Sequence, residues 1–271
     1  MKMEEILLYG GNSLAIRYIK DLLNKNPECA EKAESADKAE CADKAEFSDK
    51  RLPAVYCPGH DTTAEEARKV LKSLAPERPV SLTLLLEWQP EAGPHYAEIE
   101  REARMFAEAA GIPLAILRTG MLFGSGVGGY AERIFSDVIN ARYIHVRGCN
   151  GTLPLLTALD AARAVISTIG LTGEFTLTDG SSTTWKQLAE AMSANTGENK
   201  RMPALPLKWA RLAWKVGRWL PAVKASCSPA IIALRSSDIK IPAGECPQGF
   251  NPFSVVDVLS RQAPGYPYQD H

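Results

Sequence analysis

Short apolar runs and helical stripes alternate along the first half of the chain. The first apolar run, residues 6–9, ends at Gly10 and Gly11, and a helical stripe of apolar residues begins at Leu14. Three further apolar runs, at 52–57, 80–86 and 113–117, are separated by helical patterns at 61–74 and 96–110. This repeated order of strand and helix predicts a parallel sheet with right-handed crossovers.

The second half of the chain mixes short strands with helices. Helices are predicted at 130–141, 161–170 and 185–196, and strands at 143–146 and 174–178. An apolar segment, 153–157, leads into the middle one of these helices, for which Asp160 is the predicted cap. The C-terminal third has helical patterns interrupted by prolines.

Residues 28–50 form a low-complexity segment with a six-residue repeat of alanine, acidic residues and lysine. The composition favours helix, but the segment holds almost no apolar residue to bury. We therefore predict a solvent-exposed charged insertion, with a docking arm as the alternative.

Composition narrows the classes of function. Of the 271 residues 45% are hydrophobic and 23% charged, as in a soluble globular protein, and the net charge of −1 speaks against a nucleic-acid partner. No apolar run approaches the roughly 20 residues that cross a bilayer, so stable membrane insertion is not expected. The six cysteines and four histidines are scattered, which favours reduced thiols in a cytoplasmic protein over a metal site.

Several segments together carry a family resemblance. Residues 115–124 (AILRTGMLFG) resemble a Leu-Arg-Pro-Gly-Asn-Val-Tyr-Gly signature, and 159–164 resemble a Val-x-Asp-x-Ala-x-Ala helix start. Residues 175–188 and 203–206 are similar to the strand, turn and helix that follow. In this order and spacing, they resemble the extended short-chain dehydrogenase/reductases of the NAD-dependent epimerase/dehydratase group.

The resemblance implies a Rossmann-like α/β fold, a parallel sheet flanked by helices, with a small C-terminal substrate subdomain. We expect the Rossmann-like domain to span residues 1–170, and a mixed, substrate-type region to span 171–271. The family's second and third strands, the adenosine half of its cofactor site, have no counterpart here. The segment 28–50 stands in their place, so we predict a sheet reduced at those two strands.

The family's glycine turn is altered. Its three glycines correspond to Gly10, Ser13 and Ile16, so only the first is kept. The resemblance assigns cofactor phosphate binding to Gly10, Gly11, Asn12 and Ser13, which suits either a weakened cofactor turn or a purely structural one. Cys57 and Pro58 follow the strand that resembles the family's fourth, and are further candidates for cofactor binding.

The catalytic set of the family is altered as well. Tyr96 stands at the position of the family's catalytic tyrosine. Four residues later, where the family has a lysine, this chain has Glu100. A neighbouring carboxylate would raise the pKa of the phenol, making it a poor base. Glu100 and Arg104 are predicted to form a charge-swapped pair on the helix surface. The catalytic serine or threonine is replaced by Glu87, a candidate substrate contact.

The loop after the sixth family strand supplies the remaining candidates. Arg118 is kept and is a candidate for cofactor binding, while Met121 replaces an asparagine that contacts substrate. Met121 and Phe123 are candidate substrate contacts, and the glycine-rich residues 124–129 are either a lid or a simple connection.

The helix predicted at 208–220 has one basic face and one face rich in tryptophan. Such a helix could lie on an anionic membrane. Because the family has a substrate-domain helix here, we expect the tryptophan face to pack inward.

Two functional hypotheses follow. The first is a divergent member that is non-classical or non-catalytic and binds a small molecule. The second is an active NAD(P)-dependent epimerase, dehydratase or reductase acting on a nucleotide sugar or small carbonyl compound, with NAD or NADP as cofactor. The altered residues Ser13, Ile16, Glu87 and Glu100 favour the first hypothesis.

Overall fold

The computed structural model describes residues 6–10, 14–25, 51–59, 61–88, 93–124, 130–196 and 202–261. The chain forms two compact units. The first unit comprises Met1–Thr119, Ala158–Leu177 and Pro242–Phe250, and the second comprises Gly120–Thr157, Thr178–Ile241 and Asn251–His271. The domain boundary expected after residue 170 falls inside the first unit, because Ala158–Leu177 adds a helix and a strand to it. None of the described helices is long and apolar enough to cross a membrane.

A five-stranded parallel sheet forms the centre of the first unit. Its strand order is β1-β2-β3-β4-β9. The strands are β1 (Leu7–Tyr9), β2 (Ala54–Tyr56), β3 (Leu82–Glu87), β4 (Leu114–Thr119) and β9 (Gly173–Leu177). This sheet and its flanking helices confirm the predicted α/β Rossmann-like fold.

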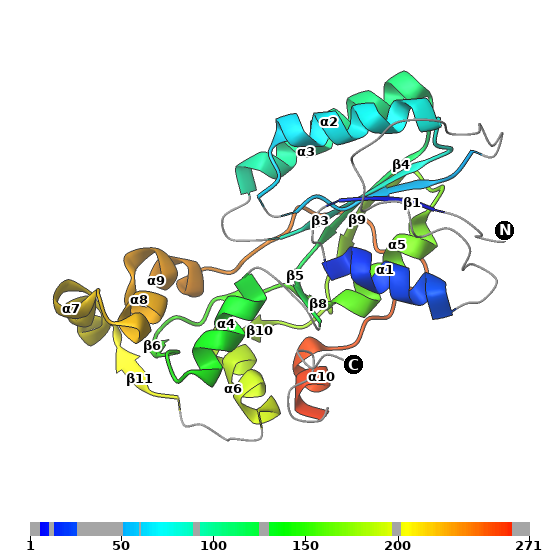
Figure 1. The fold of residues 1–271 in the computed structure, drawn as a ribbon. Coiled ribbons are helices and arrows are strands. Elements are labelled where there is room, and N and C mark those ends of the chain that lie inside the picture. Colours follow the sequence, from blue (N-terminus) through cyan, green and yellow to red (C-terminus); the bar gives the residue numbers. More distant parts are fainter. Residues whose placement is uncertain are drawn as a thin grey trace. The chain divides into compact units, whose positions relative to one another are not determined.

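Helices cover both faces of this sheet. They are α1 (Leu14–Lys25), α2 (Ala64–Leu74), α3 (Gly93–Ala110) and α5 (Ala158–Thr168), with a 3-10 turn at Ala75–Glu77 after α2. Figure 1 shows α2 and α3 together on one face, and α1 and α5 together on the other. Side chains of β3 and β4 such as Leu84 and Ile116 are completely buried, which explains the continuous apolar runs in the sequence.

The start of α2 follows directly from its sequence. The Thr63 hydroxyl accepts a hydrogen bond from the Glu66 backbone N–H, and the Glu66 carboxylate accepts one from the Thr63 backbone N–H. This capping box satisfies two backbone donors that the first helical turn would otherwise leave free. By contrast, α5 begins at Ala158, so Asp160 lies in its first turn and is not its cap.

The predicted reduction of the sheet concerns residues outside the described part of the chain. The segment 28–50 is among them. In the described residues β1 pairs only with β2, with Leu7 opposite Ala54. The replacement of two strands by the charged insertion therefore stays a prediction.

The second unit combines short strand pairs with helices. Its pairs are β5 (Met121–Phe123) with β8 (Leu155–Thr157), β6 (His145–Arg147) with β11 (Ala204–Pro206), and β7 (Thr152–Leu153) with β10 (Thr183–Thr184). Its helices are α4 (Tyr130–Ile139), α6 (Trp185–Asn195), α7 (Leu207–Gly217), α8 (Pro221–Cys227), α9 (Pro229–Ser236) and α10 (Val255–Arg261). The predicted helix 185–196 is confirmed, and Thr184 caps it through a capping box with Gln187.

A buried cation lies in the second unit. The Arg235 guanidinium carbon is 4.5 Å from the Tyr143 ring centroid and 5.9 Å from that of Trp185. Aromatic faces attract a cation most strongly where water is excluded. Two aromatic rings therefore compensate for part of the cost of burying this charge.

The expected orientation of the tryptophan-rich helix is wrong. Trp209, Leu212, Val216, Trp219 and Leu220 are all exposed. The helix, α7, instead packs through Leu207, Ala210 and Trp214 against Val146 and Cys227. The packed side of α7 thus combines the small Ala210 with the larger Leu207 and Trp214, while the predicted inward face is exposed.

Candidate functional site

The turn after β1 brings Gly10 against the end of β2. The Cys57 N–H donates a 2.9 Å hydrogen bond to the Tyr9 carbonyl, which continues the pairing of the two strands. Gly10 has a φ of +143°, and a Cβ added there would lie 2.1 Å from the Cys57 carbonyl oxygen. Only glycine fits this position, for reasons of both space and backbone conformation.

Of the residues that follow Gly10 in this turn, some are not described by the structure and one, Ile16, is buried. Gly11, Asn12 and Ser13 lie outside the described residues. Ile16 is buried, and its Cδ1 atom would be 2.8 Å from a Cβ at Gly10. The isoleucine at the third glycine position thus fills space beside the turn, as its size predicts.

Cys57 and Pro58, the candidates at the end of β2, are both buried. Burial raises the pKa of the Cys57 thiol to about 12, so the sulfur is a neutral thiol at neutral pH. Cys57 thus presents a backbone carbonyl to Gly10, not a reactive thiolate.

Tyr96 lies near the start of α3, and its hydroxyl donates a hydrogen bond to the backbone carbonyl of Glu87 at the end of β3. Burial of the phenol, followed by the negative charge of Glu87, raises the pKa of Tyr96. The predicted direction of this pKa shift is confirmed. The expected cause was Glu100, and this is wrong, because Glu100 is neutralised elsewhere.

Four charged residues form a cluster around Arg118, which we call the Arg118 cluster: Arg118, Glu100, Glu174 and Arg104. Arg118 Nε and Nη2 each donate a 2.7 Å hydrogen bond to a different oxygen of Glu100. Arg118 Nη1 donates another of 2.7 Å to Glu174, whose second oxygen accepts one of 2.7 Å from Arg104. Two cations and two anions thus balance each other, and the bidentate pair has the strongest geometry available to arginine.

The cluster changes the interpretation of two predicted residues. Glu100 and Arg104 do contact each other, at 3.7 Å, but the shorter bonds of Glu100 run to Arg118. Arg118, the candidate cofactor ligand, is 9% exposed and uses three of its nitrogens within the cluster. Hydrogen bonds from Arg118 and then Arg104 hold the pKa of Glu174 below its ordinary value.

The remaining candidates belong to different units. Glu87 ends β3 in the first unit and is half-buried. Met121 and Phe123 lie on β5 in the second unit, and both side chains are buried. The predicted lid falls largely on residues 125–129, which lie outside the described residues.

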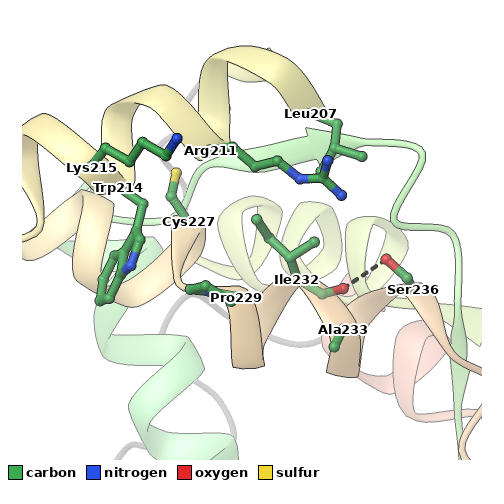
Figure 2. A pocket seen from close by; sticks show the side chains of 9 residues that line it. All are labelled: Leu207, Arg211, Trp214, Lys215, Cys227, Pro229, Ile232, Ala233 and Ser236. Carbon is green, nitrogen blue, oxygen red and sulfur yellow. Dashed lines mark hydrogen bonds between the residues drawn. The ribbon is translucent and has the colours of Figure 1, made fainter.

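A cavity of about 480 Å³ in the second unit was not predicted from the sequence. Figure 2 shows side chains from α7 on one side of it, and from α8 and α9 on the other. Its lining is mainly apolar and includes Trp214 and Ile232, with Arg211 and Lys215 as the two cations. Among the described residues no group of three or more His, Cys, Asp or Glu side chains is placed to hold a metal ion.

Comparisons with known proteins identify the fold. No protein-family model matches the chain, and no curated protein sequence matches it. The crystal structure of gox2253 is 10% identical, with an alignment that covers 95% of this chain and 96% of that protein and a TM-score of 0.60. UDP-N-acetylglucosamine 4-epimerase from Bacillus cereus is 14% identical, with coverages of 74% and 85% and a TM-score of 0.51.

A third structure, UDP-glucuronic acid 4-epimerase from Bacillus cereus in complex with UDP-glucuronic acid and NAD, is 9% identical. It covers 74% of this chain and 86% of its own, with a TM-score of 0.52. At such low identities the likeness establishes the fold alone. The resemblance to the epimerase/dehydratase group is therefore confirmed at the level of the fold.

The approach of Gly10 to Cys57 generates a prediction. Gly10→Ala should lower the free energy of unfolding by about 2–3 kcal/mol, because it adds a backbone clash to an unfavourable φ. Gly111→Ala is the matched control: its φ is +64°, but an added Cβ meets nothing within 4 Å, so only about 1 kcal/mol should be lost. Urea denaturation measures both, and equal losses would contradict the packing argument.

The Arg118 cluster predicts a pH dependence of stability. The pKa of Glu174 is lower in the folded state, so its contribution is present above the unfolded value of about 4.3 and is lost as the pH falls through the folded value. Glu174→Gln should therefore cost about 0.5–1 kcal/mol at neutral pH, with the difference from wild type vanishing in acid. Glu98→Gln, at an exposed carboxylate of α3, should change little at either pH. Urea denaturation across the pH range measures this, and a pH-independent loss in Glu174→Gln would contradict it.

Proposed function

We propose that the chain is a small-ligand-binding protein that keeps the epimerase/dehydratase scaffold and does not carry out the tyrosine–lysine proton transfer of that group. The observation that carries this proposal is the environment of Tyr96. Its hydroxyl is bonded to the Glu87 carbonyl, and its pKa is raised by burial. A phenol in this state stays protonated at neutral pH and is a poor general base.

The position of the missing lysine supports the same proposal. Glu100 stands one helical turn after Tyr96, where the resemblance places a cation that lowers the pKa of the tyrosine. Its carboxylate is held by two hydrogen bonds from Arg118. Neither residue supplies a positive charge to the phenol, because the charge of Arg118 is balanced within the Arg118 cluster.

The described residues fit a dinucleotide cofactor only in part. Gly10 keeps the close backbone approach of a phosphate-binding turn, but Ile16 fills the space where the family has its third glycine. With Glu100 in place of lysine, the nicotinamide ribose also lacks its usual partner. We therefore expect any binding of NAD or NADP to be weaker than micromolar, and we assign no catalytic step to the cofactor. A cytoplasmic location accompanies this proposal, since buried free thiols such as Cys57 suit a reducing compartment.

Titration with NADH and NADPH tests this proposal against the active-enzyme alternative. We expect no saturable fluorescence transfer from tryptophan and no thermal stabilisation at micromolar cofactor. A ligand at 100 times its Kd would stabilise the fold by about 2.7 kcal/mol, which thermal unfolding resolves easily. Saturable binding together with turnover of a nucleotide sugar, such as UDP-glucuronic acid or UDP-N-acetylglucosamine, would establish the alternative instead.

Replacement of the tyrosine gives an independent prediction. Tyr96→Phe removes the hydrogen bond to Glu87, so it should cost about 1 kcal/mol of stability and leave any ligand affinity unchanged. Tyr143→Phe is the matched control, because its hydroxyl also donates to a backbone carbonyl, that of Trp185, at 3.1 Å. If Tyr96→Phe alone abolished a measured turnover, Tyr96 would be catalytic and the proposal would fail.

A further inference from the structure

The surface of α7 is divided into three strips. The buried strip contains Ala210 and Gly217, together with the partly buried Leu207 and Trp214. It packs on the small core of α8 and β6, which includes Val223. One side of this 11-residue helix is thereby fixed to the second unit, and the other is turned outward.

The outward side carries an apolar strip and a basic strip next to each other. Trp209, Leu212 and Val216 form the apolar strip, with the i, i+3, i+7 spacing that aligns side chains along one helix face. The basic strip consists of Lys208, Arg211 and Lys215, each of which immediately precedes a residue of the apolar strip.

The apolar strip is well exposed and continues past the end of the helix. The exposed fractions are 60% for Trp209, 70% for Val216 and 76% for Trp219, which follows α7. Arg218 extends the basic strip in the same way. Large apolar side chains gathered on one exposed surface mark an interaction site.

The segment that contains α7 carries charges of one sign only. Residues 202–237 contain no aspartate or glutamate, although the whole chain has a net charge of −1. They contain six basic residues: Lys208, Arg211, Lys215, Arg218, Lys224 and Arg235. Within the described part of the chain, the four cations on and just after α7 make no salt bridge, so their charges are available to a partner.

We propose that α7 docks on the surface of an anionic lipid bilayer. Helices of this kind lie in the plane of the membrane, with the apolar strip among the upper acyl carbons and the basic strip on the headgroup phosphates. Tryptophan suits this boundary because its ring is apolar and its N–H is polar. The binding is peripheral: no described helix spans a bilayer, and α7 is only about 16 Å long.

Charge complementarity favours a lipid surface over a second copy of the chain. A symmetric contact through α7 would bring two basic strips together with no acidic residue in 202–237 to balance them. The phosphates of a nucleic acid would pair with the basic strip, but they would leave Leu212 and Val216 without an apolar environment. An anionic bilayer offers both an apolar layer and a dense negative charge.

Vesicle flotation of the full chain tests the proposal. The protein should float with vesicles of phosphatidylcholine and phosphatidylserine at low salt, and much less with phosphatidylcholine alone. Binding should weaken as salt is added, because the surface potential is screened. Tryptophan emission should shift to the blue on binding, as Trp209 and Trp219 leave water.

Two double variants test the two strips separately. Lys208→Gln/Lys215→Gln should lower the partition coefficient for anionic vesicles about 30-fold, at about 1 kcal/mol for each cation. Its control, Lys72→Gln/Lys240→Gln, removes the same charge from exposed lysines elsewhere and should change binding by less than about 3-fold. Trp209→Ala/Trp219→Ala should lower binding about 10-fold or more, whereas Met105→Ala, at an exposed apolar residue of α3, should not.

Several outcomes would overturn the proposal. These are no flotation with anionic vesicles at low salt, equal flotation with both lipid compositions, or double variants that behave as their controls do. A dimer in solution that depends on Trp209 and Trp219 would assign the surface to a second copy. Binding to an acidic protein or to nucleic acid without binding to vesicles would assign it to that partner. Thermal unfolding of each variant distinguishes a loss of docking from a loss of fold.

Discussion

The bidentate bond between Arg118 and Glu100 joins helix α3 to the sheet of the first unit. Arg118 is on the inner strand β4, and Glu100 is on α3, which covers that face of the sheet. The parallel register places Glu174 opposite Ile116, two residues from Arg118 and on the same face, where it accepts the third bond of the arginine. A buried guanidinium without any such partner would cost several kcal/mol, and Glu100, the more buried of the two carboxylates, offsets most of that cost. A lysine at position 100 would instead face a like charge.

This constraint connects packing with the residues at the positions of the family's catalytic tyrosine and lysine. In the family that this chain resembles, the residue one helical turn after the tyrosine is a lysine that lowers the pKa of the tyrosine. Here the residue at that position, Glu100, accepts hydrogen bonds from Arg118, and the Tyr96 hydroxyl donates a hydrogen bond to the backbone carbonyl of Glu87. Tyr96 and Glu100, both on α3, thus bond to residues of the sheet. Two of the positions at which the sequence departs from the family pattern, 87 and 100, are therefore positions where the structure shows internal hydrogen bonds.

The sequence predicted local features well and distant pairings poorly. The strands of the sheet follow from the apolar runs, and helix α2 follows from the helical pattern at 61–74, because both patterns lie in consecutive residues. Glu100 and Arg104 were recognised as a pair because four residues on a helix make one turn. Glu174, 70 residues from Arg104, was missed, because only the strand register brings it to the same face. The raised pKa of Tyr96 was predicted in direction, but burial as its cause needs the packed structure.

The orientation of α7 was predicted wrongly for a related physical reason. An amphipathic pattern is normally interpreted as one apolar side inward and one polar side outward, but α7 has three strips, and the buried one contains Ala210 and Gly217. These two residues carry little hydrophobicity, so the buried strip, which Leu207 and Trp214 complete, is inconspicuous in the sequence. Trp209 and Trp219 lie on the exposed side instead. Trp209 and Trp219 therefore contribute little to folding, and their exposure to water is a cost that a partner surface can remove.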